Sequence, residues 1–296
     1  MARRPTRSLA ALLIAGLALA ACTEPVADTT TPERSTPTPV SPTTSTSIGA
    51  TTTTSAVAEA TTAPRDIDAQ VTVPDGPGPF PVVVLVHGGG WMTGSPTIME
   101  PLARHLNANG YLTINTRYAL STSRRAGFPD SVDDVACAVR HGREHPNGDG
   151  TVTVIGHSAG AHIGAIVALA GSSYGADCQY PGTGTPDRFV GLAGPYDVSR
   201  LGPAMGSFFG GGPDQAPEAW EAGNPQLLTD RNPDLQSLIM YGSDDGLVPA
   251  GFAIDFYEAL VLSGSDAHLE IVEGARHNDM HDPDHVGDLI VTWLER

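Results

Sequence analysis

Three polar side chains that lie far apart in the sequence, Ser158, Asp245 and His277, each follow a predicted strand. A serine hydroxyl becomes a useful nucleophile when an imidazole removes its proton, and a carboxylate orients that imidazole and stabilises its cation. Serine, acid and histidine occur here in one of the chain orders known for such a triad. The sequence therefore predicts nucleophilic catalysis with Ser158 as the nucleophile, Asp245 as the acid and His277 as the base.

The nucleophile is predicted from its surroundings. Ser158 is the centre of Gly156-His157-Ser158-Ala159-Gly160, which fits the pattern G-x-S-x-G. Residues 151–155 before it are β-branched and apolar, which predicts a buried strand, and the helix-forming run 161–170 follows it. The two glycines let strand and helix approach closely, so that the hydroxyl is exposed beside the helix N-terminus. Read alone, the five-residue pattern also fits a chance match or a turn that serves only packing.

The acid and the base both have neighbours of the same type. Asp244 precedes Asp245, and we prefer Asp245 because it is the aspartate of a D-x-x-V-P turn, whereas Asp244 suits a turn or cap role. Two further histidines follow the predicted base, His281 and His285. They suggest metal ligands at helical spacing, but Pro283 lies between them and interrupts a helix that would hold one ligand face. We therefore predict no metal site.

A glycine-rich segment offers hydrogen-bond donors for a developing oxyanion. The segment His87-Gly88-Gly89-Gly90-Trp91 follows the apolar strand predicted at 81–86. Fixed N–H donors stabilise negative charge on a substrate oxygen, and loss of one typically costs about 3–4 kcal/mol. We expect the backbone amides of Gly89, Gly90 and Ala159 to be these donors, with His87 in a structural role. The alternative is a tight turn without a catalytic role.

Together these motifs resemble a known family. GHSAG, HGGGW, the D-x-x-V-P turn and a late G-x-x-H turn occur in the order typical of the α/β-hydrolase superfamily, and resemble its esterase/lipase branch with an HGGG/HGGxW oxyanion loop. The resemblance extends from about Ile67 to Trp293, and implies the three roles assigned above to the serine, the aspartate and the histidine. HGGGW with GHSAGAH is also similar to the arylformamidases, which hydrolyse amides.

Strands and helices alternate along the rest of the chain. We expect strands at 67–73, 81–86, 111–116, 151–155, 189–193, 238–241 and 268–272, and helices at 96–109, 129–145, 161–170, 250–262 and 286–294. Such alternation predicts an α/β fold with a doubly wound, mostly parallel sheet. Active sites of such sheets lie at the carboxyl ends of the strands. The predicted triad residues and the glycine-rich segment 87–91, called the donor loop below, all follow strands.

A Gly/Pro-rich stretch, about 196–234, is predicted to be a small cap inserted over the edge of the sheet. Five aromatic residues lie in or near this stretch or the donor loop: Trp91, Tyr196, Phe208, Phe209 and Trp220. They fit two interpretations equally well. They line an acyl or alcohol pocket, or they form a small core of the insertion itself.

The N-terminal part of the chain has the pattern of an export signal. Residues 1–21 carry three arginines and then an apolar run too short to span a membrane, which predicts a signal peptide. Leu19-Ala20-Ala21-Cys22 resembles a bacterial lipobox, so we expect Cys22 to carry lipid and to anchor the protein outside the cytoplasm at the cell membrane. The alternative is cleavage near Ala21 and secretion, and Arg3-Arg4 only weakly suggests twin-arginine export.

Composition separates a tether from a folded domain. Residues 23–64 are mostly Thr, Ser, Pro and Ala, which predicts a disordered tether and leaves 65–296 for one hydrolase domain. The net charge of −17 argues against a nucleic-acid partner, whereas the absence of lysine among 16 basic residues suggests a GC-rich coding sequence. Cys137 and Cys178 remain, either as a disulfide, which would contribute about 3–4 kcal/mol, or as two buried thiols.

The leading functional prediction is a serine hydrolase that cleaves small-molecule carboxylic esters. We expect acyl groups of small to moderate size, because the sequence shows no long apolar lid helix. The predicted mechanism needs no metal or organic cofactor. An arylformamidase-type amide hydrolase is the second prediction, which an extracytoplasmic location disfavours. A non-catalytic binding module is the third, and it is disfavoured because such modules usually lack a triad member.

Overall fold

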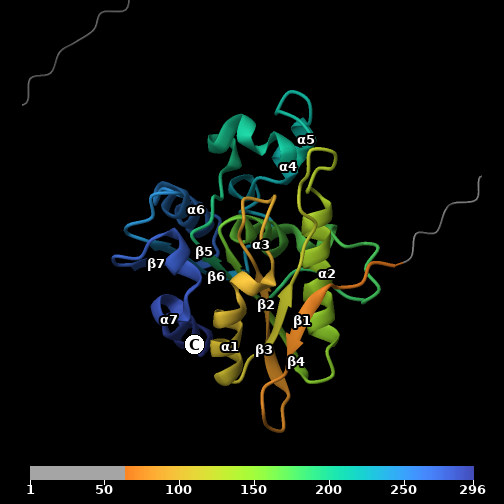
Figure 1. The fold of residues 1–296 in the computed structure, drawn as a ribbon, viewed down its shortest axis with the longest axis vertical. Helices are drawn as coiled ribbons and strands as arrows, with labels where there is room; N and C mark the ends of the chain where they lie inside the picture. Colours follow the sequence, from red (N-terminus) through yellow and green to blue (C-terminus); the bar gives the residue numbers. More distant parts are fainter. Residues whose placement is uncertain (1–63) are drawn as a thin grey trace, which may run out of the picture. The chain divides into compact units, whose positions relative to one another are not determined.

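The computed structural model describes residues 64–296, which form one seven-stranded sheet in the order β1-β3-β2-β4-β5-β6-β7 (Figure 1). The first strand pairs antiparallel with β3 and the other neighbours pair in parallel, which confirms the predicted α/β fold with a mostly parallel sheet. The strands are β1 (Ala69–Thr72), β2 (Phe80–Val86), β3 (Leu112–Thr116), β4 (Gly148–His157), β5 (Arg188–Leu192), β6 (Gln236–Gly242) and β7 (Asp266–Val272). The predicted signal peptide and Cys22 lie outside the described residues, as does the predicted tether up to residue 63.

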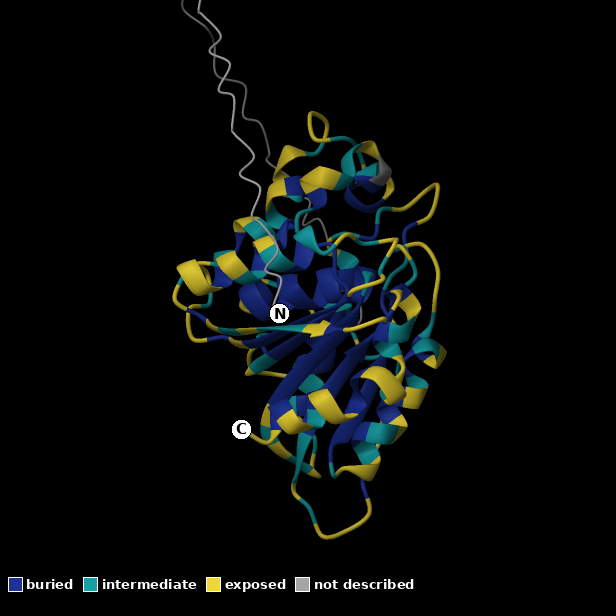
Figure 2. Cartoon of the chain, turned by 90° about the vertical axis from the view of Figure 1, so that its left-hand side faces the viewer, coloured by how far each residue is buried: buried dark blue, intermediate teal, exposed yellow. Residues whose placement is uncertain are grey.

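Helices cover both faces of the sheet because its central strands are apolar on both sides. In β2, Val82 and Val84 face one core, while Val83 and Leu85 face the other, and all four are buried. Figure 2 shows the dark blue strands enclosed between helices. The first core is covered by α2 (Asp130–Glu144), α3 (Ala159–Ala170) and α6 (Gly251–Leu262), and the second by α1 (Glu100–Ala108) and α7 (Pro283–Leu294).

Two helices differ from the sequence prediction for reasons that involve proline. The expected helix at 96–109 is divided into a short 3-10 helix, η1 (Pro96–Ile98), and α1, which has a proline in its first turn. The last helix, α7, begins at Pro283, three residues before the expected start. Proline is tolerated at the first helical position, where its missing N–H has no partner in any case. The carboxylate of Asp282 accepts the N–H of Asp284 and caps this end.

The insertion between β5 and β6 consists of short helices with an aromatic core. Its elements are η3 (Val198–Met205), α4 (Gly206–Phe209), α5 (Pro217–Ala222) and η4 (Pro225–Leu227), and Figure 1 shows α4 and α5 at the top of the domain. The ring of Phe209 lies 5.0 Å from that of Phe208 and 4.8 Å from that of Trp220, measured between centroids. All three side chains are buried, so aromatic packing holds the insertion together.

A disulfide joins Cys137 of α2 to Cys178 in the segment that precedes β5, 41 residues apart in sequence. The backbone of Arg65 passes beside this bridge, where its N–H donates to Asp177 and its carbonyl accepts from Gln179. The described domain is thus tied at its first residues to α2. Within residues 64–296, no helix is both long enough and apolar enough to span a membrane.

Candidate active site

The turn from β4 to α3 holds Ser158 in a backbone conformation that few residues with side chains adopt, with φ 54° and ψ −119°. A methyl group added at Gly156 would lie 2.3 Å from the carbonyl oxygen of Gly160. One added at Gly160 would lie 2.2 Å from the carbonyl oxygen of Val86. Both glycines of the G-x-S-x-G pattern are therefore required by close backbone packing, which forces the serine out at the end of the strand.

The imidazole of His277 lies between the other two members of the predicted triad. Its Nε2 is 2.9 Å from Oγ of Ser158, and its Nδ1 is 2.8 Å from Oδ2 of Asp245. An ionised carboxylate only accepts hydrogen bonds, so Nδ1 carries the proton and Nε2 accepts the serine hydroxyl. The side chains of His277 and Asp245 are 10% and 1% exposed, so the hydrogen bond between them is shielded from water. The arrangement has the geometry that a base-activated serine needs.

The two adjacent aspartates, Asp244 and Asp245, make different contacts. The second carboxylate oxygen of Asp245 accepts the N–H groups of Leu247 and Val248, at 2.8 and 2.9 Å, which fixes the carboxylate in its turn. Asp244 is exposed, and its carboxylate lies 3.4 Å from the hydroxyl of Ser243. Only Asp245 therefore reaches the imidazole.

The competing histidines occupy other places. His277 and His281 begin and end a 3-10 helix, η5, which the sequence analysis did not predict. His281 lines the cleft but has no contact with Oγ of Ser158, while His285 lines a separate opening beside α7. Among the described residues, no group of three or more His, Cys, Asp or Glu side chains is placed to hold a metal ion.

The donor loop after β2 is shaped by glycines with positive φ. Gly89 and Gly90 have φ of 128° and 59°. The carbonyl of Gly89 accepts the N–H groups of Met92 and Thr93, so it points away from the cleft. Within residues 64–296, the backbone amides of Gly89, Gly90 and Ala159 donate to no protein acceptor, and all three residues lie next to Ser158 or line its cleft. These amides are free to bind a substrate oxygen.

Two alanine substitutions in this loop are expected to differ in effect. A methyl group at Gly89 would lie 2.0 Å from the carbonyl oxygen of Thr93, whereas one at Gly90 meets nothing within 4 Å. Gly89→Ala must therefore displace the loop, and we expect kcat to fall about 100-fold or more, as when an oxyanion donor is lost. Gly90→Ala carries only the cost of positive φ, about 1 kcal/mol, and a smaller loss of activity. Steady-state kinetics on folded protein tests this order, and a larger loss in Gly90→Ala would contradict it.

Two buried histidines beside the nucleophile were not assigned a role from the sequence. Nδ1 of His162 accepts the indole N–H of Trp91 at 3.1 Å, and its Nε2 donates to the carbonyl of Gly223 at 2.8 Å. His162 thus connects the donor loop, α3 and the insertion. His157 donates from Nε2 to the backbone carbonyl of His277 at 3.0 Å. Their place in GHSAGAH was visible in the sequence, but their partners come from distant segments.

Both buried histidines are neutral in the folded protein. Burial, together with the charges of His277 and His281, lowers the pKa of His157 to about 3, although its hydrogen bond to a carbonyl opposes this. Burial lowers the pKa of His162 to about 4, against a similar hydrogen bond to Gly223. The protons that an unfolded chain would bind near pH 6.5 are therefore excluded from the native state.

This exclusion predicts a loss of stability in mild acid. Because the unfolded chain binds more protons, the free energy of unfolding should decrease as the pH falls below about 6.5, by up to about 1.4 kcal/mol per pH unit for each histidine. Urea denaturation between about pH 7 and pH 5 measures this slope, above the range in which ordinary carboxylates titrate. His162→Gln removes one of the histidines with a lowered pKa and should reduce the slope. An unchanged slope would contradict the assignment.

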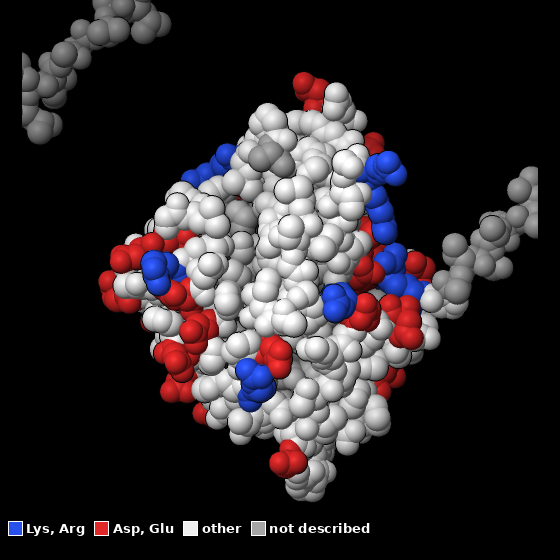
Figure 3. All heavy atoms as spheres, in the orientation of Figure 1, with Lys and Arg blue, Asp and Glu red and all other residues white. Residues whose placement is uncertain are grey.

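A cleft of about 670 Å³ opens beside the serine, and its wall is uncharged. The residues that line it include apolar Ile98, Pro101 and Leu247 and several polar residues, and no Asp, Glu, Lys or Arg is among them. Figure 3 shows charged side chains gathered on the two flanks of one face of the domain, with a largely uncharged strip between them.

The pocket interpretation of the five aromatic residues is corrected by the structure, because none of them lines this cleft. Tyr196 is fully buried and stacks on Phe256 of α6 at 4.2 Å between ring centroids. Trp91 is held against His162. The other three form the core of the insertion described above. Large aromatic surfaces are buried here for packing, which a composition argument could not separate from a binding role.

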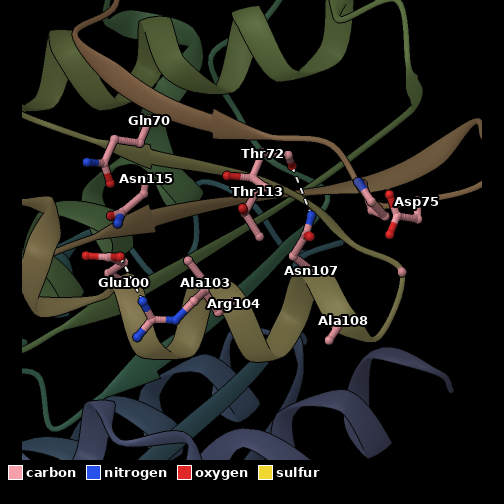
Figure 4. Close-up of a pocket in the computed structure, with 12 residues that line it drawn as sticks. Gln70, Thr72, Asp75, Glu100, Ala103, Arg104, Asn107, Ala108, Thr113 and Asn115 are labelled. Carbon is pink, nitrogen blue, oxygen red and sulfur yellow. Dashed lines mark hydrogen bonds and ion pairs between the residues drawn. The ribbon is translucent and has the colours of Figure 1, made fainter.

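A second opening lies between the β1–β3 edge of the sheet and α1 (Figure 4). Its walls carry amides, hydroxyls and the ion pair of Glu100 with Arg104. It contains no serine, cysteine or histidine, so it holds no pair comparable with Ser158 and His277. The chemistry of the molecule is therefore assigned to the cleft at Ser158.

Known proteins resemble this chain in sequence. A family model described as BD-FAE matches residues 70–260. Esterase LipC from Mycobacterium tuberculosis is 27% identical over 226 residues, which cover 67% of this chain and 55% of LipC. Carboxylesterase NlhH from the same species is 34% identical over 94 residues, 30% of this chain and 29% of NlhH. The chain thus spans about half the length of LipC, and a smaller share of NlhH.

Solved structures share the fold. The acetyl ester-xyloside bifunctional hydrolase from Caldicellulosiruptor lactoaceticus is 21% identical with a TM-score of 0.67, over 78% of this chain and 88% of that one. The esterase Est2 from Thermogutta terrifontis is 20% identical with a TM-score of 0.62, over 78% of this chain and 86% of that one. At this level of identity the likeness establishes a common fold, that of the α/β-hydrolases.

Proposed function

The chain belongs to the BD-FAE family, and from that premise we propose that it is a serine hydrolase that cleaves carboxylic esters through an acyl-enzyme. The observation that carries the proposal is the imidazole of His277 within hydrogen-bond distance of both Ser158 and Asp245. Relatives named esterase and carboxylesterase support the choice of esters. In addition, the structurally similar Thermogutta terrifontis esterase 2 has been obtained phosphonylated by sarin.

The geometry supports a two-step reaction. Oγ of Ser158 attacks the ester carbonyl carbon while its proton passes to Nε2 of His277, and the carbonyl oxygen becomes an oxyanion held by the backbone amides of Gly89, Gly90 and Ala159. The carbon–oxygen bond to the alcohol then breaks, and the alcohol leaves with the proton from His277. A water molecule repeats the sequence on the acyl-enzyme, which releases the acid and restores the serine.

We further propose that the substrate is a neutral ester with an acyl group of small to moderate size. An uncharged cleft supports neutrality, because a charged group would lose its hydration there without an opposite charge to pair with. The short helices of the insertion do not line the cleft, and the apolar side chains that line it are those of Ile98, Pro101 and Leu247, which supports a short rather than a long acyl chain.

A chain-length series tests this proposal. p-Nitrophenyl acetate, butyrate, octanoate and palmitate are each offered to the purified protein, with N-formylkynurenine as an amide comparison. We expect kcat/KM to be highest for acetate or butyrate and to fall for palmitate. Preference for N-formylkynurenine would favour the amide hydrolase, and preference for palmitate would contradict the acyl size.

The location of the protein is a separate proposal, which rests on the sequence alone. We propose that Cys22 carries lipid and holds the domain at the outer side of a bacterial membrane, because the apolar run before it ends in Leu-Ala-Ala-Cys. Metabolic labelling with an alkyne fatty acid should mark the wild-type chain and not a Cys22→Ser variant. Equal release of both proteins into the medium would favour secretion instead.

A further inference from the structure

His157, the residue directly before the nucleophile, lies at the junction of two functional loops. Its side chain is only 3% exposed. On one side, a Cβ added to Gly88 would lie 2.8 Å from Nδ1 of His157, so the donor loop packs directly on the ring of His157. On the other side, its ring centroid is 4.9 Å from that of His277 and 4.8 Å from that of His281. One imidazole therefore separates the donor loop from η5, which carries the base.

The direction of its hydrogen bond follows from its chemistry. A neutral imidazole has one N–H, and the partner of Nε2 is the backbone carbonyl of His277, which can only accept. The proton is therefore on Nε2. The other nitrogen, Nδ1, is buried and has no hydrogen-bond partner among the described residues. A buried acceptor left without a partner costs free energy, so packing alone does not explain a histidine at this position.

The backbone of the base has a contact with another strand as well as those within its own loop. The side-chain contacts of His277 to Ser158 and Asp245 orient its ring, and neither of them acts on its backbone. The hydrogen bond from His157 acts on the carbonyl of the same residue, one bond from the Cα that carries the imidazole. It thus connects the backbone of the base to β4, the strand that carries the nucleophile.

We propose that His157 is a positioning residue for the reaction, which holds the backbone of His277 at the height where the imidazole reaches the serine hydroxyl. The inference depends on the proposed function for its kinetic readout. A displacement of about 1 Å between reacting groups can lower a rate about 100-fold, so a single buried hydrogen bond has a measurable effect on catalysis.

The test compares side chains that keep or lose the Nε2 donor. His157→Gln retains an amide donor at nearly the position of Nε2, whereas His157→Leu keeps similar bulk without a donor. Relative to wild type, we expect His157→Leu to lower kcat about 10- to 100-fold with little change in KM, and His157→Gln to recover most of that loss. Both kcat values are expressed per folded molecule. The folded fraction of each variant is measured from its unfolding transition.

A matched control separates positioning from loss of stability. Val152 is buried in the same strand but far from η5, so Val152→Ala destabilises β4 without contact to the base. Its kcat per folded molecule should equal that of wild type. If His157→Leu does not fold, His157→Asn replaces it, because the shorter amide does not reach the carbonyl of His277. His157→Asn should then have a lower kcat than His157→Gln.

A spectroscopic readout does not depend on any substrate. The Nδ1 proton of His277, shared with Asp245, should give a low-field proton resonance in wild type, assigned by its loss in His277→Ala. We expect it to persist in His157→Gln and Val152→Ala, and to shift or broaden in His157→Leu. If wild type hydrolyses no ester and the resonance still responds in this way, the function fails and the positioning role stands. Equal kcat and equal resonances in the Leu and Gln variants would overturn the inference.

Discussion

Ser158→Ala is expected to lower kcat for p-nitrophenyl acetate by a factor on the order of 10⁴ to 10⁶, the range seen when the nucleophile of a serine hydrolase is removed. Among the described residues, no other hydroxyl is hydrogen-bonded to the imidazole of His277, so none is placed to replace Ser158 as the nucleophile. The KM value should change little, since the substitution removes a single hydroxyl from the cleft wall. Steady-state kinetics on the purified variant measures both quantities.

A serine outside the site provides the control for this substitution. Ser207 is an exposed residue of α4 in the insertion, and among the described residues its hydroxyl donates to the sulfur of Met92 alone. Ser207→Ala should retain wild-type kcat. Substantial turnover by Ser158→Ala, at more than a trace of the wild-type rate, would show that another nucleophile performs the reaction.

Asp245→Asn is expected to lower kcat about 10⁴-fold, because the asparagine stabilises the unproductive tautomer of His277. The N–H groups of Leu247 and Val248 point at one oxygen of Asp245 and will hold the carbonyl oxygen of the asparagine there. Its NH₂ group then faces Nδ1 of His277 and donates to it. The imidazole must carry its proton on Nε2, where it can no longer accept the proton of the serine hydroxyl.

The adjacent aspartate makes an unusually close control. Asp244→Asn changes the net charge by the same amount, one residue away, on a carboxylate that does not contact His277. We expect its kcat to stay within about two-fold of wild type, since exposed charges have small effects. Kinetics on the two variants under identical conditions decides between the acids. A greater loss in Asp244→Asn would reverse the assignment.

Much of this architecture follows from local sequence patterns. Strand β2 is a continuous apolar run, and the buried part of β4 consists mainly of β-branched and apolar residues, as parallel sheets require because both faces are covered. Ser158 was predictable because the G-x-S-x-G turn needs both glycines for steric reasons. The order of the triad along the chain then placed Asp245 and His277 after successive strands. These features depend on residues that are neighbours in sequence.

The features that were missed depend on distant segments. Neither the contact of His157 with His277 nor that of His162 with Trp91 and Gly223 has a periodicity or spacing that reveals it. The aromatic residues show the same limit, because burial in an insertion core and exposure in a pocket require the same composition. The start of α7 at Pro283 was missed because a proline between histidines was interpreted as a break rather than as a first helical residue.

The central claim is that the hydroxyl of Ser158 is activated by His277 and becomes acylated. The most direct measurement is peptide mass spectrometry of the protein quenched with acid during turnover of p-nitrophenyl butyrate, with a fluorophosphonate as a second, irreversible probe. A butyryl group and a phosphonyl group are expected on Ser158, and both should be absent from folded His277→Ala treated for the same time. Labelling of a different residue, or none on active wild-type protein, would contradict it.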